Sequence, residues 1–437
     1  MISVRSEFQS KELDGLNNLP SDWHICRLKH LFKIQNGATP KSDTSEFWDG
    51  DLIWVTPADI SKLSSEYVRD SAKKITRAGL DSCGTTLVPE GTIVLSTRAP
   101  IGSICVAERN LCTNQGCKSL IPKNEVNSKF YYYYLRVSKD FLNLKGSGTT
   151  FLELPTYEMA NFNAPLPTID IQNHVVFFLD REVYRIEKLI SEKQNFIKLL
   201  KEKRQALISH VVTKGLDSDV AMKDSGVEWI GTTPKIWDVA AIKRLTAVQR
   251  GASPRPIDDQ AYFDPSGEYA WTRIADVSKT DGELKETLQR LSSLGSSFSV
   301  KLEPGSLFLS IAGTVGKPCI TTIKACIHDG FVYFPTLERV RTKFLFYVFQ
   351  SGEPYKGLGK MGTQLNLNTE SVGSIKISFP KMEEQDRIVR FIDERTYKIN
   401  TIIRETERSL DLLKERRAAL ISAAVTGKID LREKEVA

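Results

Sequence analysis

Apolar residues recur at alternating steps of four and three positions between residue 168 and about residue 213, a stretch without glycine or proline. Eight of the ten positions in this register are apolar, and the exceptions are Lys193 and Arg204. A period of about 3.5 residues is typical of a coiled-coil seam rather than of an ordinary amphipathic helix. The pattern therefore predicts one long helix that Gly215 terminates. Its predicted seam residues are Leu179, Val183, Ile186, Ile190, Ile197, Leu200 and Leu207.

The same register returns near the C-terminal end of the sequence. Leu199–Ser209 reads LLKEKRQALIS and Leu412–Ser422 reads LLKERRAALIS, so nine of eleven positions are identical at an offset of 412 − 199 = 213. A helix with such an apolar stripe gains most of its stability by packing the stripe. We therefore expect the two helices to pair antiparallel, with a parallel dimerisation coil as the alternative. The second set of seam residues is Ile392, Ile399, Ile403, Leu410, Leu413 and Leu420.

The segments that precede the two helices also repeat. Pro20–Trp23 and Pro234–Trp237 share a proline and a tryptophan at an offset of 234 − 20 = 214. Each is followed by β-branched and aromatic runs that are typical of strands, such as Leu52–Val55. Phe130–Leu135, with four consecutive tyrosines, predicts a half-buried helix.

These patterns predict an α+β fold class, with two globular domains of mixed helix and strand separated by two long helices packed as an antiparallel coiled coil. The halves are related by a pseudo-twofold internal repeat. The expected divisions are a first domain, a central helix, a second domain, a C-terminal helix and a tail, at 1–167, 168–214, 215–380, 381–427 and 428–437.

Composition narrows the class of protein only a little. The 437 residues exceed one ordinary hydrophobic core, and 41% hydrophobic and 26% charged residues are usual for a soluble folded protein. The formal net charge of +6 is compatible with a nucleic-acid partner without requiring one. Seven cysteines without a C-x-x-C pair, a polar N-terminal segment and no long apolar run predict a reduced protein of the cytoplasm without a membrane span.

The two halves differ most in their loops. GATPKSDT at 37–44 corresponds to GASPRPID at 251–258, and LSTRAPIGS at 95–103 corresponds to LSIAGTVGK at 309–317. Two domains that share a scaffold but differ in their loops could each recognise a different sequence. Near-identical helix ends could each bind one copy of the same partner protein.

The tandem repeat, the strand–loop motifs, the helix ends and the segment DSGVEWIG at Asp224–Gly231 resemble the specificity subunit of type I restriction–modification systems. The resemblance covers nearly the whole chain. It implies a non-catalytic DNA-binding subunit whose two target recognition domains each read one half of an asymmetric bipartite target, with the coiled coil setting the gap.

The resemblance also implies protein partners. Two methyltransferase subunits would dock on the chain, and restriction/translocase subunits would join through them, giving a type I restriction enzyme and adenine DNA methyltransferase complex. S-adenosylmethionine, ATP and magnesium are then expected on the partner subunits, with no cofactor or metal on this chain.

Loop side chains that can read bases or hold phosphates are the candidate DNA contacts. Arginine reads guanine and Asn or Gln reads adenine in the major groove, whereas Lys, Ser and Thr mostly hold phosphates. For each candidate, a solvated surface role is the alternative. The candidates are Lys41, Thr97, Arg98, Ser147, Thr149 and Thr150 in the first domain and Arg250, Arg255, Arg273, Lys360, Thr363, Gln364 and Asn366 in the second.

No catalytic site is predicted. Gly357–Gly362 matches G-x-G-x-x-G but lacks the strand–helix context of a dinucleotide site. Asp59 and Asp276 occupy matching positions in separate domains, and we interpret them as helix-cap or turn residues. His328 is interpreted as a loop histidine with a hydrogen-bond partner. The alternative function is a coiled-coil protein–protein adaptor whose globular domains bind peptides.

Overall fold

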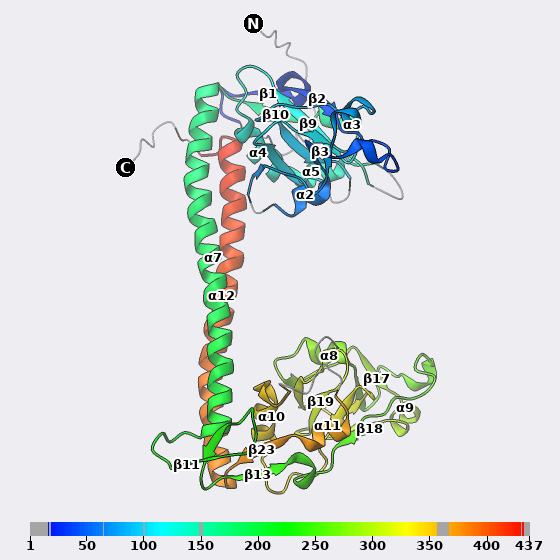
Figure 1. The fold of residues 1–437 in the computed structure, drawn as a ribbon, viewed down its shortest axis with the longest axis vertical. Coiled ribbons are helices and arrows are strands. Elements are labelled where there is room, and N and C mark those ends of the chain that lie inside the picture. Colours follow the sequence, from blue (N-terminus) through cyan, green and yellow to red (C-terminus); the bar gives the residue numbers. More distant parts are fainter. Residues whose placement is uncertain are drawn as a thin grey trace. The chain divides into compact units, whose positions relative to one another are not determined.

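The computed structural model describes Leu16, 19–63, 65–98, 101–147, 152–355, 367–429 and Leu431. The chain divides into two compact units, Met1–Lys193 with Ser409–Ala437, and Gln194–Arg408. Each unit contains one sheet-rich domain and a portion of both long helices, α7 (Ile169–Lys214) and α12 (Met382–Val425) (Figure 1).

The first domain is built on a five-stranded sheet in the order β2-β9-β6-β7-β4, accompanied by the sheet β5-β3-β8 and the pair β1-β10. In the five-stranded sheet, neighbours run antiparallel except β7 and β4. The strand β6 consists of buried residues throughout, as a central strand does. The strand bounds are β1 (His24–Arg27), β2 (Phe32–Asn36), β3 (Trp48–Val55), β4 (Tyr67–Val68), β5 (Lys74–Ile75), β6 (Ile93–Ser96), β7 (Ile104–Ala107), β8 (Cys112–Thr113), β9 (Cys117–Pro122) and β10 (Asn163–Leu166).

Short helices connect these strands, and one of them occupies the core. The side chain of Asn127 caps α4 by accepting hydrogen bonds from the backbone N–H groups of Lys129 and Phe130. The helices of this domain are α1 (Leu28–Leu31), η1 (Ser45–Phe47), α2 (Pro57–Ser61), α3 (Arg77–Asp81), α4 (Ser128–Val137), α5 (Lys139–Leu144) and α6 (Thr156–Ala160).

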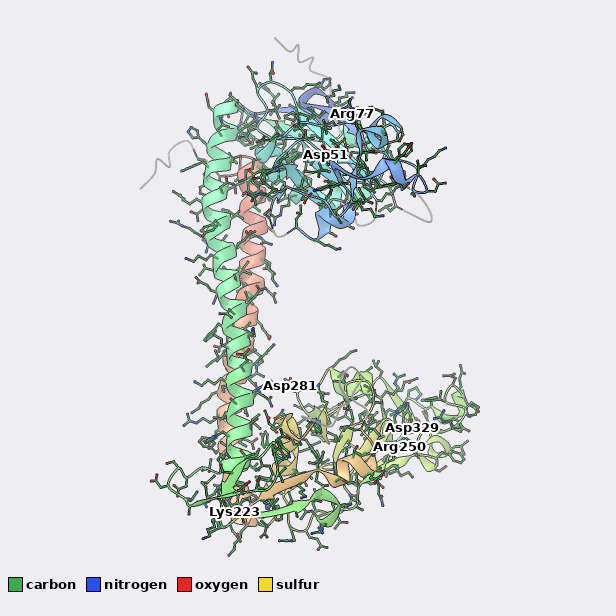
Figure 2. The ribbon with its side chains drawn as sticks, in the orientation of Figure 1. Asp51, Arg77, Lys223, Arg250, Asp281 and Asp329 are labelled. Carbon is green, nitrogen blue, oxygen red and sulfur yellow. The ribbon has the colours of Figure 1, made fainter. Side chains whose placement is uncertain are left out.

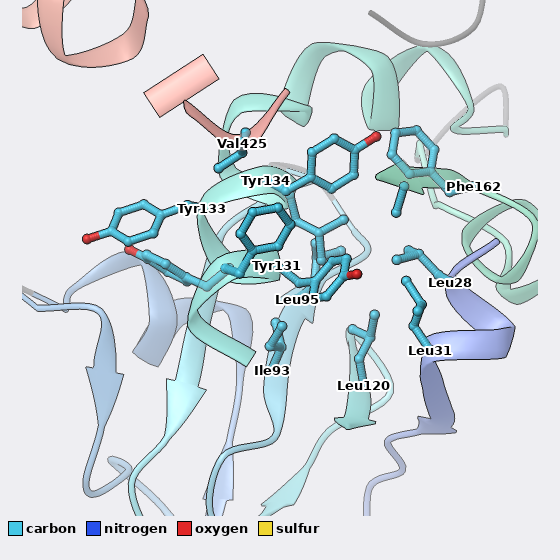
Figure 3. Close-up of a cluster of buried hydrophobic side chains, with 14 of the residues drawn as sticks. Leu28, Leu31, Ile93, Leu95, Leu120, Tyr131, Tyr133, Tyr134, Phe162 and Val425 are labelled. Carbon is cyan, nitrogen blue, oxygen red and sulfur yellow. The ribbon is translucent and has the colours of Figure 1, made fainter. Parts of the chain in front are cut away.

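The prediction that Phe130–Leu135 is half-buried is wrong. All six residues of this stretch in α4 are buried. The reason is that α4 is covered on several sides. Sheet residues such as Ile93 and Leu120 and the α12 residue Val425 pack around it (Figure 3), and Leu179 of α7 belongs to the same core. The tyrosines tolerate this burial because their hydroxyls find partners: Tyr131 donates to the carbonyl oxygen of Pro165 at 3.0 Å.

The second domain repeats this architecture. Its main sheet has the order β14-β22-β19-β20-β16, a second sheet has the order β17-β15-β21-β18, and β13 pairs with β23. A hairpin of β11 and β12 precedes the domain. The strand bounds are β11 (Met222–Asp224), β12 (Thr232–Pro234), β13 (Asp238–Ala241), β14 (Gln249–Arg250), β15 (Tyr269–Thr272), β16 (Glu283–Leu284), β17 (Gln289–Leu291), β18 (Val300–Leu302), β19 (Leu307–Ser310), β20 (Pro318–Thr321), β21 (Ala325–Ile327), β22 (Phe331–Tyr333) and β23 (Lys376–Phe379).

The two main sheets match strand for strand, so the predicted internal repeat is confirmed at the level of topology. Even the register agrees, because Ser96 faces Cys117 in the first sheet and Ser310 faces Phe331 in the second. The buried helix α10 (Thr342–Gln350) takes the place of α4. The other helices of the second domain are η2 (Ile242–Arg244), η3 (Gln260–Tyr262), α8 (Ile274–Ser278), α9 (Ser293–Ser297), η4 (Glu353–Tyr355) and α11 (Thr369–Ser374).

The long helices pair antiparallel, as expected. In the second unit, Lys201 of α7 lies 3.8 Å from Glu407 of α12. Arg204, about one turn later on α7, donates to Asn400, which lies about two turns before Glu407 on α12, at 2.5 Å. In the first unit, Arg417 pairs with Glu187 at 3.2 Å. The apolar stripe of each helix is thus covered within the chain, which is the condition that stabilises such helices.

The predicted seam residues are all buried or half-buried. Leu179, Val183, Ile186, Ile197, Ile392, Ile403 and Leu410 are buried, and the remaining six are half-buried. At the C-terminal ends of the helices the buried position shifts by one residue, from Leu207 to Ile208 and from Leu420 to Ile421. There the helix enters a domain core: Ile208 packs with Trp237, and Ile421 belongs to the core that contains Trp23.

A membrane span is not found among the helices of the described residues, none of which is both long and apolar enough.

Candidate nucleic-acid interface

Asp329 brings two of the candidate arginines of the second domain together. Arg250, the last residue of β14, donates its Nε–H to the backbone oxygen of Asp329 at 2.6 Å. Arg255, in the loop after β14, donates to the carboxylate Oδ2 at 3.0 Å, and the Ser253 hydroxyl donates to Oδ1 at 3.0 Å. Figure 2 shows Arg250 and Asp329 beside each other. This cluster of Arg250, Ser253, Arg255 and Asp329 is the Asp329 cluster.

The Asp329 cluster is charged, with Asp329 as its anionic centre. Burial alone would raise the pKa of the Asp329 carboxyl, but the hydrogen bond from Ser253, the neighbouring His328 ring and the positive charges of Arg255 and Arg250 lower it below its usual value. The Nδ1 atom of His328 accepts a hydrogen bond from the backbone N–H of Gly330 at 2.8 Å, which requires an unprotonated Nδ1. Burial lowers the pKa of His328, in agreement with a neutral ring. His328 is therefore a satisfied loop histidine, as interpreted from the sequence.

Gly251 allows the loop of the Asp329 cluster to approach the turn between β21 and β22. An added Cβ at Gly251 would lie 2.3 Å from the carbonyl oxygen of His328. Gly37 is in the equivalent place, where a Cβ would lie 1.9 Å from the carbonyl oxygen of Asn114. Both domains thus need glycine where the loop leaves the sheet.

Arg273 lies close to His328 and precedes α8. Its backbone N–H donates to Asp276 at 2.9 Å, the contact that caps the helix. Its Nε lies 3.9 Å from the Asp276 carboxylate, which is too long for a hydrogen bond, and Nε has no hydrogen-bond partner among the described residues. In the first domain Thr56 occupies this place and Asp59 accepts its backbone N–H at 2.8 Å. The interpretation of Asp59 and Asp276 as cap residues is therefore confirmed.

In the first domain, Glu153 brings two candidates together. Arg98 Nε lies 3.1 Å from its carboxylate, and the backbones of Ser147 and Glu153 exchange two hydrogen bonds, at 2.9 and 3.0 Å. Thr97 differs from its neighbour, because its side chain is fully buried and its hydroxyl donates to the carbonyl oxygen of Gly116 at 3.3 Å. Thr97 therefore presents no surface to a ligand in this structure.

Lys41 lies apart from that pair, in the loop that follows Gly37. Its side chain is exposed, and its carbonyl oxygen accepts a hydrogen bond from Trp48 Nε1 at 3.1 Å. In the second domain the carbonyl oxygen of Arg255 accepts one from the Tyr262 hydroxyl at 3.0 Å. Lys41 and Arg255 are equivalent in the repeat, at an offset of 255 − 41 = 214, so the two domains anchor this position in the same way.

Several polar residues beside these candidates were not predicted from the sequence. Lys118 is nearly buried in β9, and its Nζ lies 3.4 Å from Asn36, which also accepts from Thr156 at 3.0 Å. Burial lowers the pKa of Lys118, the Arg98 charge lowers it further and the Glu153 charge opposes that effect. A lysine within the strand Cys117–Pro122, whose first four residues are buried, was the available signal. For Asp329, the available signal was the polar pair His328-Asp329 in the turn between the apolar strands β21 and β22.

The remaining candidates, Thr149, Thr150, Lys360, Thr363, Gln364 and Asn366, lie outside the described residues, as do all residues of Gly357–Gly362.

The thiols of this chain are poorly suited to nucleophilic chemistry. Burial raises the pKa of Cys105 and Cys319 to about 12 and that of Cys112 and Cys326 to about 11. All seven cysteines are free. Among the described residues, no group of three or more His, Cys, Asp or Glu side chains is placed to hold a metal ion.

The long helices expose apolar residues at three equivalent positions in both units, in addition to Phe177 and Phe196 of α7, whose repeat counterparts are polar. In the first unit these are Tyr184, Leu189 and Leu412, and in the second they are Tyr397, Ile402 and Leu199. Their exposed fractions range from 41% to 68%, and Tyr184 and Tyr397 are both 68% exposed. Each pair, for example Tyr184 with Tyr397, is related by the repeat offset of 397 − 184 = 213. These three-residue sets are called the exposed apolar sets.

Comparison with known proteins assigns both halves to one kind of domain. A family model described as the type I restriction modification DNA specificity domain matches residues 20–199 and again residues 234–410. The MjaIX specificity subunit of a type I restriction enzyme from Methanocaldococcus jannaschii is 32% identical over 199 residues, which is 45% of this chain and 45% of that protein. The alignment thus spans less than half of that relative.

Two further comparisons extend over nearly the whole chain. The specificity subunit of the type I restriction enzyme EcoBI from Escherichia coli is 21% identical, covering 98% of this chain and 90% of its own length. A solved structure concerned with complex assembly and conformational transition of the type I R-M system matches with a TM-score of 0.75 at 16% identity, covering 94% of this chain and 100% of the other. The HsdS subunit from Thermoanaerobacter tengcongensis matches with a TM-score of 0.54 at 17% identity, covering 96% and 100%. At these identities the two structures show the fold alone.

Proposed function

Because this chain belongs to the family of type I restriction–modification DNA specificity domains, we propose that it reads a double-stranded DNA target in two halves, one by each globular domain. The chain itself carries no catalysis. It selects the target and brings to it the subunits that modify or cut DNA, and the paired helices set the gap between the half-sites.

One observation carries this proposal: two matching scaffolds anchor chemically different loop side chains. Trp48 and Tyr262 hold the backbones of Lys41 and Arg255 through equivalent hydrogen bonds. The reading positions are therefore placed alike, but lysine and arginine differ in what they recognise, because only the guanidinium offers a fork that fits guanine. Two such domains read an asymmetric target.

The proposed partners are two copies of a methyltransferase subunit, with restriction/translocase subunits attached through them. The exposed apolar sets support two copies of one partner, because each unit offers a tyrosine and two aliphatic residues at equivalent places. Tyrosine is enriched among residues that dominate protein interfaces. S-adenosylmethionine, ATP and magnesium would be bound by those partners. The free thiols suit the reducing cytoplasm, which is the proposed location.

Selection from a randomised library of double-stranded DNA tests this function. The purified full-length chain should enrich a motif with two fixed parts and a gap of constant length, and its affinity should fall steeply with salt as phosphate contacts are screened. With S-adenosylmethionine the chain alone should leave DNA unmethylated, and with the methyltransferase subunit it should direct methylation to the motif. Absence of any enriched motif, together with binding to peptides, would favour the adaptor alternative.

A further inference from the structure

We infer that Asp329 is a positioning residue that fixes the Arg255 side chain for reading one guanine base in the half-site of the second domain. The inference rests on the proposed function. It adds to it that the base is guanine, that Arg255 contacts this base and that Asp329 orients Arg255.

Arg255 is held at both ends. The Tyr262 hydroxyl donates to its carbonyl oxygen at 3.0 Å, and Asp329 accepts from its Nη2 at 3.0 Å. The side chain of Arg255 is nevertheless 70% exposed, whereas that of Asp329 is 28% exposed. The carboxylate therefore restrains one edge of the guanidinium and leaves the other N–H groups open to solvent. An exposed arginine that is already ordered loses less conformational freedom when it binds.

Asp329 is itself held in place by its surroundings. Ser253 donates to one carboxylate oxygen at 3.0 Å, and Arg250 donates to the Asp329 backbone oxygen at 2.6 Å. His328 Nε2 lies 3.2 Å from the same carboxylate oxygen as Ser253. An isolated surface ion pair would be worth little and would not fix a side chain. Here both carboxylate oxygens and the backbone oxygen have partners, so the position of Asp329 is determined from several directions.

The position of the carboxylate within the cluster favours Arg255 as the base-reading group. An exposed aspartate can accept from the amino group of cytosine, but the side chain of Asp329 is only 28% exposed and each of its oxygens already accepts a hydrogen bond from a neighbouring side chain. The side chain that this carboxylate orients, and that stays 70% exposed, is Arg255, and the fork of its guanidinium fits the O6 and N7 acceptors of guanine in the major groove. The reader is therefore Arg255, and Asp329 acts through it.

The first domain supports the assignment by an equivalent arrangement with other side chains. Gln115 takes the place of Asp329, at 329 − 115 = 214, and accepts a hydrogen bond from Thr39 as Asp329 does from Ser253. Lys41 takes the place of Arg255. The anchoring contacts of Trp48 and Thr39 are thus shared with Tyr262 and Ser253, while the residues at the positions of Arg255 and Asp329 both differ, which is expected of positions that determine specificity.

The test is selection of the randomised duplex library by the full-length chain and its variants. Asp329→Asn removes the charge but keeps an oxygen for Ser253, and it should lower the preference for guanine about tenfold at one base pair of one half-site. Arg255→Lys, an exposed substitution that keeps the charge and loses the fork, should relax the same base pair by a similar factor. The rest of the motif, the gap and the salt dependence should stay as in the wild-type chain.

A matched control is Asp238→Asn, which breaks another exposed aspartate–arginine pair of the same domain, with Arg339 at 2.6 Å. It should leave every position of the motif unchanged. Should Asp329→Asn fail to fold, Arg255→Lys alone decides, because retained guanine preference in that variant overturns the inference. Preference lost at different base pairs in the two variants also overturns it. A wild-type chain that enriches no motif would instead refute the proposed function, and the assignment of Asp329 with it.

Discussion

The two globular domains agree in the strand order and register of their main sheets and differ in the side chains of the loops beside those sheets. Their main sheets have the same strand order and register, and a glycine leaves each sheet at the same place. Around that glycine, Asn36, Lys41 and Gln115 of the first domain correspond in the repeat to Arg250, Arg255 and Asp329 of the second. The comparison teaches that packing and loop anchoring constrain the scaffold, while the residues they present are free to change.

A second difference concerns the ion pairs that join the buried helix of each domain to the long helices. In the first unit, Lys129 of α4 lies 2.9 Å from Glu66 and 2.8 Å from Asp180 of α7. In the second unit, Lys343 of α10 lies 2.8 Å from Asp393 of α12. An ion pair between a lysine of the buried helix and an aspartate of a long helix is common to both units, and in the first unit Glu66 is an additional partner of the lysine.

Glycine substitutions should have the largest effect and should act on one half-site at a time. Gly251→Ala places a Cβ 2.3 Å from a backbone oxygen, so the loop of the Asp329 cluster must move. We expect a loss of about 1–3 kcal/mol in local stability and loss of the second half of the selected motif. Gly37→Ala should do the same to the first half. Library selection measures the motif, and denaturant unfolding measures stability.

The control for this prediction is Gly84→Ala, where the nearest atom to the new Cβ is 3.9 Å away. It should be tolerated in both measurements. Loss of both halves of the motif in Gly251→Ala would contradict the claim that each globular domain reads one half-site.

Substitution of Lys129 should lower the stability of its helix more than substitution of Lys343. Lys129→Met leaves two carboxylates without their partner and should destabilise α4 by about 1–3 kcal/mol. Lys343 is 43% exposed, against 17% for Lys129, and has a single carboxylate partner, so Lys343→Met should cost less than about 1 kcal/mol at α10. Native-state hydrogen exchange of the backbone amides of α4 and α10 measures both. Equal losses would show that Glu66 adds nothing.

The Lys129 effect should also depend on pH. Although burial would raise it, the hydrogen bond and charge of Lys129 lower the pKa of Glu66 below its ordinary value of 4.5. A lowered carboxyl pKa stabilises the fold above the ordinary value, and this contribution is lost as the pH falls through the folded-state pKa. The stability difference between Lys129→Met and the wild-type chain should therefore narrow below about pH 4.5.

Substitutions in the exposed apolar sets should have the smallest effect on stability and act on partner binding. Tyr184→Ser and Tyr397→Ser should each change stability by no more than about 0.5 kcal/mol. Each should weaken one of two binding sites for the methyltransferase subunit about tenfold, since exposed tyrosines often dominate such interfaces. Titration of the partner by calorimetry measures both sites. Identical curves for the wild-type and the double variant would remove these residues from the interface.

The repeat, the helix register and the cap residues could be predicted because each depends on local spacing. The seam positions follow from a period of 3.5 residues, and Asp59 and Asp276 lie three residues after the positions that they cap. The shift from Leu207 to Ile208 was not predictable from the period, because it arises where the helix end leaves its partner and enters the core beside Trp237.

The interface could be predicted only in part, because its organising contacts join distant parts of the chain. Arg250 and Arg255 were chosen for their chemistry, but Asp329, which holds both, lies more than 70 residues away in sequence. Thr97 follows a strand and has a suitable hydroxyl, yet the backbones of Gly116 and Leu154 enclose it. Such burial depends on long-range packing that neither the residue type nor the spacing reveals.

Exchange of one domain tests the central claim most directly. Residues 20–165 would be replaced by the corresponding segment of a relative that has a different target, and the chimeric chain would be carried through the library selection. We expect one half of the motif to be replaced completely, with the gap and the other half unchanged. A chimera in which both halves change, or in which the unexchanged half is lost, would contradict the account that each domain reads its own half-site.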